Sequence, residues 1–326
     1  MFRVCCNCTL PEEIISEYKE KFILECPTNG KAFETATDLC SRLNEYEGLL
    51  VAGLTVKEDI LQHGERLKAI ANIGVGYDNI DVENASRRKI AVINTPDSVT
   101  EATAELTMAI LLCAVRCILP LDRKVREQGT FPPLSPFPIG VGSLYGKTLG
   151  IIGMGRIGKA VARRAVAFGM RVVYNNPHKI DARGLDATPV SLEGLLNQAD
   201  VISIHCPSTP QNYHLVNEDF LSRVKPGAVL VNAARGDLIN ENALVESLKS
   251  GRLSAVALDV FEHEPKVHPE LLQMNQVVLS PHIGTYAYDI RLEMVREALD
   301  GLYLVLNGQS ARNVVNKDVL IQERQS

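Results

Sequence analysis

Short apolar runs of strand length alternate with amphipathic stretches along almost the whole chain. The apolar runs before residue 98 are FRVCCN, FILECP, LLVAGL, LKAIANI and AVINTP. Two stretches of helical character lie between them, PEEIISEYKEK and TATDLCSRLNEY. Consecutive parallel strands need a crossover helix, so strands that alternate with helices are typical of α/β domains. This part of the chain is predicted to form a flavodoxin-like unit of roughly five strand–helix repeats.

A helical stretch, a connector and a second strand–helix series follow. Apolar residues recur near helical spacing from about 99 to 127, at Leu106, Ile110, Leu111 and Val115. The next segment, GTFPPLSPFPIGVGSLYG, is rich in Pro and Gly and is predicted to be a connector. Strands and helices then alternate from 147 to about 281, and a last helix is predicted over about 286–307.

This order of segments predicts two domains, one inserted into the other. At roughly 100–200 residues per domain, a chain of 326 residues has room for two. The fold class predicted is α/β, with both domains doubly wound. A Rossmann domain, 99–288, would be inserted into a flavodoxin-like domain, 1–98 and 289–326, with a cleft between the two.

Composition and charge exclude several classes of function. The chain is 46% hydrophobic and 22% charged, which is ordinary for a globular protein, and its formal net charge is −5. Without a basic excess we expect neither nucleic acid nor a membrane as partner, and a small anionic substrate would need a local positive site. No apolar run reaches about 18 residues, and the first residues lack a signal-peptide profile, so we predict a cytoplasmic protein.

Eight cysteines are scattered through the chain. Cys5, Cys6 and Cys8 are spaced like part of a metal cluster, but no second CxxC and no nearby His completes four ligands. We predict no metal and interpret these residues as buried or half-buried thiols, with Cys113 and Cys117 as packing residues one helical turn apart. Disulfides are not expected in a reducing cytoplasm.

A glycine motif opens the second strand–helix series. Gly153, Gly155 and Gly158 follow the predicted strand LGII and precede a helix and a further strand, which is the context of a dinucleotide-binding fingerprint. The first glycine permits the tight turn, the second lets the backbone approach a pyrophosphate, and the third lets helix and strand pack closely. Free N–H groups and the dipole of the helix favour the anion. The alternative is a glycine turn that binds no ligand.

The end of the next strand predicts which dinucleotide binds. An acid about 20 residues past the glycines would bind the ribose hydroxyls of NAD. Asn175 and Asn176 stand there instead, followed by His178 and Lys179. Without a carboxylate to repel a 2′-phosphate, NADP(H) is favoured over NAD(H), although no Arg stands there to clamp the phosphate.

Polar residues follow three later strand-like runs. They are Arg235 in VNAARGDLIN, Asp259 and Glu264 in LDVFEHEP, and His282 in LSPHIGT. In doubly wound sheets, ligands bind outside the carboxyl ends of the strands. We therefore expect these side chains to converge on one site. Taken singly, each has a structural alternative as a core histidine, a surface ion pair or a loop acid.

Together with NIGVGYDNID, INTPDSVTEATAELTMAILL and HCPSTPQN, these segments resemble the D-isomer-specific 2-hydroxyacid dehydrogenase family over essentially the whole chain. The resemblance implies hydride transfer between a nicotinamide cofactor and a small 2-keto acid, with Arg235, Glu264 and His282 as the catalytic set. It also places the substrate carboxylate on the backbone of Val75 and Gly76. Leu54 would shape the substrate pocket.

The chemistry needs these residue types. Reduction of a keto group requires a proton for the developing alkoxide, and the imidazole of His282 titrates near neutral pH. Glu264 can hold the other ring nitrogen and favour the imidazolium. Arg235 can make paired hydrogen bonds to the carboxylate and keto oxygens. Gly74 and Gly76 would let backbone N–H groups face the carboxylate.

The resemblance also implies cofactor contacts spread over the predicted dinucleotide-binding domain. Asp259 and Gly284 would face the nicotinamide, with Thr103 on the same side, and the backbone of Cys206 and Pro207 would line the adenosine side. The full predicted set is Thr103, Gly153, Gly155, Arg156, Ile157, Gly158, Asn175, Asn176, Cys206, Pro207, Ala233, Asp259 and Gly284. One departure weakens the contacts of the HCPSTPQN loop: Asn212 stands where family members often carry a second Thr.

Several substrates and one non-enzymatic function stay open. The resemblance favours glyoxylate, hydroxypyruvate or 2-ketogluconate, with a D-3-phosphoglycerate or D-lactate dehydrogenase as the alternative. A related corepressor group uses this fold as an NAD(H)-sensing interaction protein, and a third option is an isomerase or hydrolase with a fixed nucleotide. The helical stretch from 99 resembles the element through which family members pair, so we predict a homodimer; the same helix could simply bridge the two domains.

Overall fold

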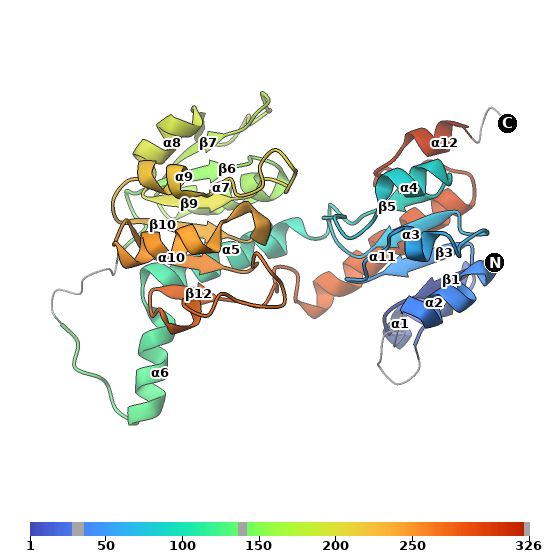
Figure 1. Ribbon diagram of the computed structural model, residues 1–326, viewed down its shortest axis with the longest axis horizontal. Coiled ribbons are helices and arrows are strands. Elements are labelled where there is room, and N and C mark those ends of the chain that lie inside the picture. Colours follow the sequence, from blue (N-terminus) through green and yellow to red (C-terminus); the bar gives the residue numbers. More distant parts are fainter. Residues whose placement is uncertain (28–35, 136–141, 323–326) are drawn as a thin grey trace. The chain divides into compact units, whose positions relative to one another are not determined.

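The computed structural model describes residues 1–27, 36–135 and 142–322 (Figure 1). The contacts between residues divide the chain into two compact units. The first unit comprises Met1–Val99 and Thr285–Ser326, and the second comprises Thr100–Gly284. Part of the predicted connector, 136–141, lies outside the described residues.

The first unit is built on a parallel sheet with the strand order β2-β1-β3-β4-β5. Its strands are β1 (Phe2–Cys6), β2 (Phe22–Glu25), β3 (Gly48–Val51), β4 (Ala69–Asn72) and β5 (Ala91–Ile93). All four residues of β3 and of β4 are buried, and all but Asn72 at the end of β4 are apolar. A strand covered on both faces needs such a nearly continuous apolar run.

Helices cover both faces of this sheet. They are α1 (Glu12–Tyr18), α2 (Ala36–Arg42), α3 (Glu58–Leu61), α4 (Val82–Arg87), α11 (Tyr288–Leu306) and α12 (Asp318–Gln322), with a 3-10 turn at Leu43–Glu45. One core, against α1 and α11, contains Val4 and Cys6 with Leu299. The opposite core contains Cys5 and Leu49. Successive residues of β1 therefore face opposite sides of the sheet, as the pleat of a strand requires.

The second unit is built on a parallel sheet with the order β12-β11-β10-β9-β6-β7-β8. Its strands are β6 (Thr148–Ile152), β7 (Arg171–Asn175), β8 (Ala187–Pro189), β9 (Val201–Ile204), β10 (Ala228–Asn232), β11 (Leu253–Leu258) and β12 (Val277–Leu279). The chain starts at β6, builds outward to β8, and then returns to the other side of β6 with β9. This reversal creates the switch point at which doubly wound sheets bind ligands.

Helices lie on both faces of this sheet as well. They are α5 (Thr100–Val115), α6 (Ile118–Gln128), α7 (Arg156–Ala167), α8 (Leu192–Gln198), α9 (Glu218–Arg223) and α10 (Glu241–Lys249), with 3-10 turns at Gly236–Leu238 and Leu271–Gln273. Buried residues of α5 and α7 share one core with the sheet, and those of α8, α9 and α10 share the other. The predicted fold class, doubly wound α/β in both parts, is confirmed.

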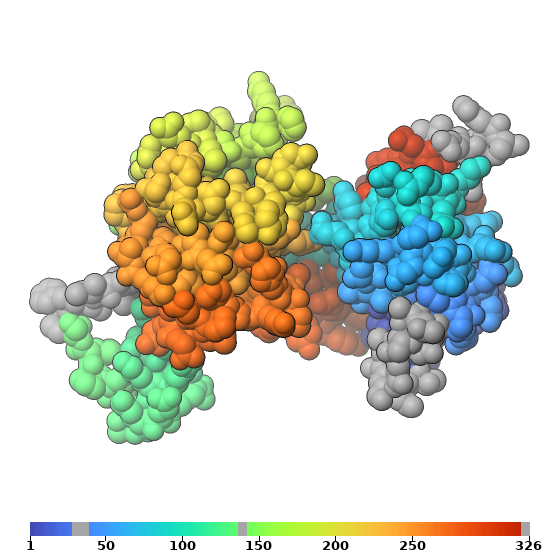
Figure 2. Space-filling model, in the orientation of Figure 1, coloured from blue at the N-terminus to red at the C-terminus, as the bar shows by residue number. Residues whose placement is uncertain are grey.

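The helical stretch predicted over 99–127 is two helices instead of one. Helix α5 ends at Val115 and α6 begins at Ile118, with Cys117 between them in the left-handed region at φ 51° and an angle of 64° between the two axes. Pro120 explains the break, because its ring would clash with the carbonyl of Arg116 in a continuous helix. Beyond the break, α6 projects from the rest of its unit (Figure 2).

Within the described ranges, no single helix is both long enough and apolar enough to cross a membrane. The bent pair α5 and α6 passes that test only when the two helices are taken together, by length and composition alone.

Candidate active site

The turn between β6 and α7 is shaped by glycine. Gly153 has φ +94°, and a Cβ atom there would lie 2.5 Å from the backbone nitrogen of Cys206. At Gly158 a Cβ would lie 2.4 Å from the carbonyl oxygen of Gly153. Larger residues fit neither position, so both glycines are needed for the turn itself.

Gly155 has a different environment from its two neighbours. It is the N-cap residue of α7, and a Cβ there would meet no atom within 4 Å. The space beside Gly155 is open, and a helix N-terminus favours an anion, so the turn fits the pyrophosphate of a dinucleotide. Arg156 and Ile157 form the first turn of α7, where Arg156 is exposed and Ile157 packs partly against the core.

Two asparagines stand at the end of β7, and one of them, Asn176, bonds to this turn. Asn176 accepts a hydrogen bond from the N–H of Met154 at 2.6 Å, which ties the strand end to the glycine loop. Asn175 donates to the carbonyl of Val190 at 3.0 Å. His178 and Lys179 follow on the surface. The position where an NAD-binding acid would stand is therefore a neutral amide beside the pyrophosphate turn.

The loop after β9 is held by Asn212, the residue that departs from the family pattern. Its carbonyl oxygen accepts from the N–H of Thr209 at 2.6 Å, and its amide donates to the carbonyl of Pro207 at 2.7 Å. Cys206 packs over Gly153. Burial lowers the pKa of His205 to about 4, and its ring bonds to Ser203 at 2.8 Å, so this histidine stays neutral and structural.

Arg235 lies in the loop after β10, and Asn232 fixes the shape of that loop. The Asn232 amide donates to the Arg235 carbonyl at 2.7 Å, and its oxygen accepts from the N–H of Ala234 at 3.0 Å. The guanidinium of Arg235 donates to the Ala234 carbonyl at 2.7 Å. Ala233 and Arg235 are half-buried, so both reach the surface at the carboxyl end of the strand.

Gly236 brings the Arg235 loop against the loop after β11. A Cβ atom at Gly236 would lie 1.9 Å from the carbonyl oxygen of Phe261. Farther along, Glu241 and Glu262 exchange hydrogen bonds, because the N–H of each donates to the carboxylate of the other at 3.1 Å. The two loops are thus joined at a backbone contact and by this reciprocal pair.

Glu264 and His282 meet from the loops after β11 and β12. The Nδ1 atom of His282 lies 3.0 Å from Oε2 of Glu264, and the other carboxylate oxygen accepts from the N–H of Phe261 at 3.1 Å. Burial alone would raise the pKa of Glu264, but the hydrogen bond and charge of His282, the Phe261 N–H and the charge of Arg235 outweigh it and lower that pKa. The carboxylate is therefore ionised at neutral pH and faces the ring.

The backbone of His282 is held in the left-handed region, at φ 53°. Its N–H donates to the Asp259 carbonyl at 2.8 Å. The buried carboxylate of Asp259 then accepts from the N–H groups of Ile283 and Gly284, both at 2.9 Å, and from the Ser280 hydroxyl at 2.7 Å. Burial raises the pKa of Asp259, and these donors oppose that rise. A non-glycine residue in this conformation costs energy, which the surrounding bonds offset.

Thr103, on α5, lies beside Asp259 and Gly284. A Cβ atom added to Gly284 would lie 3.3 Å from the Asp259 carboxylate and 3.5 Å from the Thr103 side chain. The structure therefore brings Thr103, Asp259 and Gly284 together.

Of the substrate-binding residues predicted in the first unit, Val75 and Gly76 lie on the loop after β4, and Leu54 lies on the loop after β3. Asparagine side chains take up the carbonyls of all three: Asn94 donates to Val75 at 2.8 Å, Asn72 to Gly76 at 2.7 Å, and Asn79 to Leu54 at 2.7 Å. Among the described residues, the N–H groups of Val75 and Gly76 find no acceptor. A fixed pair of such donors suits a carboxylate.

Sequence reasoning did not single out Asn232, Gly236 or Ser280. The RGD of VNAARGDLIN gave one signal, since a glycine beside a functional arginine indicates close backbone approach. Asn232 acts through bonds within its own loop, and Ser280 acts through its bond to Asp259 on the neighbouring strand end. In the part of the chain that the structure describes, no group of three or more His, Cys, Asp or Glu side chains could hold a metal ion.

The chain is similar to known proteins over almost its whole length. Residues 108–284 match the family described as D-isomer specific 2-hydroxyacid dehydrogenase, NAD binding domain. The chain is 42% identical to the glyoxylate reductase of Thermococcus litoralis, over 95% of this chain and 96% of that protein. It is 38% identical to glyoxylate/hydroxypyruvate reductase B of Yersinia pseudotuberculosis, over 90% and 91% of the two chains. An NADPH-dependent glyoxylate/hydroxypyruvate reductase of Sinorhizobium meliloti, solved with NADP and malonate, superposes with a TM-score of 0.83 at 30% identity and covers 96% of each chain.

Proposed function

Because the chain belongs to the D-isomer-specific 2-hydroxyacid dehydrogenase family, we propose that it reduces a small 2-keto acid, glyoxylate or hydroxypyruvate, to the corresponding 2-hydroxy acid. The observation that carries this proposal is the bond of 3.0 Å between His282 and Glu264, in the same unit as the dinucleotide turn. An imidazole braced by an ionised carboxylate is a proton donor, which reduction of a keto group requires.

The residues divide the chemistry between them. When bound, the nicotinamide cofactor supplies the hydride. His282 gives its Nε2 proton to the keto oxygen as charge develops there, and Glu264 orients the ring and stabilises the imidazolium. Arg235 polarises the keto group and binds the carboxylate with its guanidinium. Val75 and Gly76 offer N–H groups to the carboxylate.

The cofactor proposed is NADPH in preference to NADH. The protein binds a nicotinamide dinucleotide as a member of its family, and the preference is argued from the end of β7. Asn176 carries no charge to repel a 2′-phosphate, and His178 and Lys179 are exposed beside it. The relative from Sinorhizobium meliloti is NADPH-dependent, which supports the same choice.

We propose a homodimer formed through the α5–α6 segment. Helix α6 buries none of its residues against the described chain. Its exposed apolar side chains are Ile118, Leu119 and Val125, followed by Phe131 and Leu134. A surface of this kind on a projecting helix favours a protein partner. Light scattering at several concentrations should give twice the chain mass of 35.8 kDa, and a monomer mass would exclude the dimer.

The test of function is oxidation of NADPH and NADH, followed by absorbance, against glyoxylate, hydroxypyruvate, 2-ketogluconate, pyruvate and phosphohydroxypyruvate. We expect turnover with the first two acids and a loss of about 10²–10⁴ in kcat for His282→Gln, the usual worth of a general acid. Turnover confined to pyruvate or phosphohydroxypyruvate would replace the proposed substrate. Tight dinucleotide binding without turnover on any acid would exclude the reductase and favour an NAD(H)-sensing protein.

A further inference from the structure

Two cysteines face each other where β1 and β2 end, in the unit that does not carry the dinucleotide turn. The two strands are parallel neighbours, and Cys5 pairs with Glu25. Cys6 is the last residue of β1, and Cys26 directly follows the last residue of β2. Both pack against the core shared with α11, with Cys6 fully buried and Cys26 half-buried.

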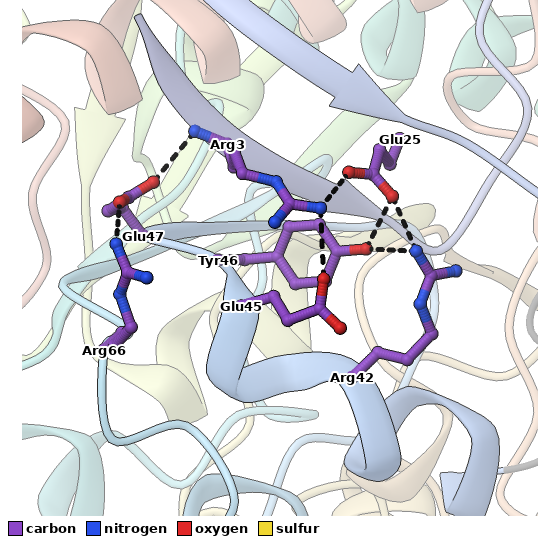
Figure 3. A network of polar contacts seen from close by, with 7 residues as sticks. All are labelled: Arg3, Glu25, Arg42, Glu45, Tyr46, Glu47 and Arg66. Atoms are coloured by element: carbon purple, nitrogen blue, oxygen red, sulfur yellow. Dashed lines mark hydrogen bonds and ion pairs between the residues drawn. The ribbon is translucent and has the colours of Figure 1, made fainter.

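A polar network on the opposite face fixes the register of this pair. Figure 3 shows Arg3, Arg42 and Tyr46 converging on Glu25, with contacts of 2.6, 2.6 and 2.8 Å. Successive side chains of a strand point to opposite faces. The anchored Glu25 therefore directs Cys26 toward Cys6, and β2 cannot slip by one residue without breaking the network.

Cys26 differs from the neighbouring thiols in its acidity. The nearby Cys6 thiol and Leu10 N–H favour its thiolate, outweigh burial, and lower the pKa of Cys26 to about 7. By contrast, burial raises the pKa of Cys5 to about 12 and that of Cys8 to about 11. Of these neighbouring thiols, Cys26 is the one that ionises near neutral pH.

We propose that Cys26 and Cys6 form an oxidation site, in which a hydroperoxide oxidises Cys26 and Cys6 resolves the product as a disulfide. This site goes beyond the proposed reductase and uses none of its residues. A partly exposed thiolate beside a second thiol is the arrangement that redox-sensitive cysteines share. Parallel strands lie about 4.8 Å apart. That spacing falls within the roughly 4.4–6.8 Å between Cα atoms that a disulfide spans.

The oxidation of Cys26 and its resolution by Cys6 take two steps. The thiolate of Cys26 attacks one oxygen of hydrogen peroxide, an S–O bond forms, the O–O bond breaks, and hydroxide leaves. Cys26 is now a sulfenic acid, oxidised by two electrons, and the peroxide is reduced. The Cys6 sulfur then attacks the Cys26 sulfur, the S–O bond breaks, and the leaving hydroxide takes the Cys6 proton as water.

The full-length protein is treated with hydrogen peroxide, its remaining thiols are blocked with N-ethylmaleimide, and its peptides are mapped by mass spectrometry. We expect one disulfide, between the peptides that contain Cys6 and Cys26. In Cys6→Ala, dimedone should trap a sulfenic acid on Cys26, and Cys26→Ser should form neither product. Cys40→Ser is the matched control, because Cys40 is also half-buried but burial raises its pKa, and it should react as the wild type does.

A second measurement needs no variant. Iodoacetamide should label Cys26 of the untreated protein with a half-maximal rate near pH 7, against about pH 8.5 for an ordinary thiol. At pH 7 it should label Cys26 roughly tenfold faster than Cys40. A wild-type protein whose eight thiols all remain titratable after peroxide, a disulfide between other residues, or labelling of Cys40 ahead of Cys26 would overturn the proposal.

Discussion

Nδ1 of His282 and Oε2 of Glu264 lie 3.0 Å apart, although the two residues come from loops that follow different strands. The bond leaves Nε2 as the ring atom available to a substrate. It also gives the ring an ionised partner, since the pKa of Glu264 is lowered. The contact with Glu264 therefore both orients the His282 ring and places a negative charge beside it, and a variant can separate these two effects.

Glu264→Gln tests the charge while it keeps an acceptor for Nδ1–H. The proton donor must be protonated for reduction, so activity falls as pH rises. Without the carboxylate the ring loses its charged partner, and we expect kcat/KM for reduction at neutral pH to fall about tenfold, since an adjacent opposite charge is worth roughly that much. Because the pKa of Glu264 lies below its usual value, the wild type should lose no activity from this group down to pH 5.

The measurement is a pH profile of 2-keto acid reduction for both proteins. Glu246→Gln is the control, because it removes a carboxylate from an exposed ion pair with Lys249. A kcat/KM at neutral pH that is the same in Glu264→Gln and the wild type would mean that the carboxylate only positions the ring.

Gly236→Ala tests the contact between the Arg235 loop and the loop that carries Glu264. The added methyl would lie 1.9 Å from the Phe261 carbonyl oxygen, so the backbone must move. Overpacking of this kind costs about 1–3 kcal/mol, which lowers Tm by roughly 2–10 °C in a domain of this size. We also expect kcat/KM to fall at least about tenfold, since Arg235 is the next residue.

Calorimetry and steady-state kinetics measure both effects. Gly142→Ala provides the comparison, because a Cβ there meets no atom within 4 Å. Equal Tm and kcat/KM in Gly236→Ala and the wild type would show that the two loops adjust independently.

Local patterns carried most of the fold prediction. The strands of both sheets follow apolar runs that need cover on both faces, and the glycine turn needs small residues at fixed spacing, so both features are visible in sequence. The break at Cys117 was missed although Pro120 marks it, because the apolar spacing continues through Leu119 and Leu121. Spacing alone does not show where a proline ring interrupts a helix.

Contacts between distant segments could not be predicted in the same way. The residue types alone predicted that Glu264 would hold His282, and the structure places the two side chains in contact. Their catalytic roles stay predictions. The bonds from Asn232 to its own loop, and the facing of Cys6 and Cys26, depend on backbone course and strand register. Neither leaves a pattern in a single sequence.

Asp259→Asn tests how the loop after β12 is held. In the wild type, the carboxylate accepts hydrogen bonds from the N–H groups of Ile283 and Gly284, both at 2.9 Å. An amide has only one acceptor oxygen, so its NH₂ group would face one of these two N–H donors. Hydrogen bonds to a charged group are worth about 1.5–3 kcal/mol each. We expect faster amide exchange at Ile283 and Gly284 and a drop of at least about tenfold in kcat. Ser280→Ala removes one donor only and should have a smaller effect; exchange unchanged in Asp259→Asn would show that Asp259 does not hold the loop.

Asn176→Asp tests the choice of dinucleotide. Asn176 accepts the Met154 N–H at 2.6 Å through its oxygen, and aspartate keeps that acceptor in the same shape. The new charge would repel a 2′-phosphate and could accept a ribose hydroxyl, as the acid of NAD-binding turns does. Two like charges near a surface interact by a few kcal/mol at most, so the ratio of kcat/KM for NADPH over NADH should fall about 10- to 100-fold.

Steady-state kinetics with each cofactor give the ratio. Asn175→Leu is the comparison, since it adds no charge and loses the bond of 3.0 Å from the amide to Val190, so activity should fall equally with both cofactors. A ratio that Asn176→Asp leaves unchanged would mean that the end of β7 does not face the ribose, and that the preference is set elsewhere.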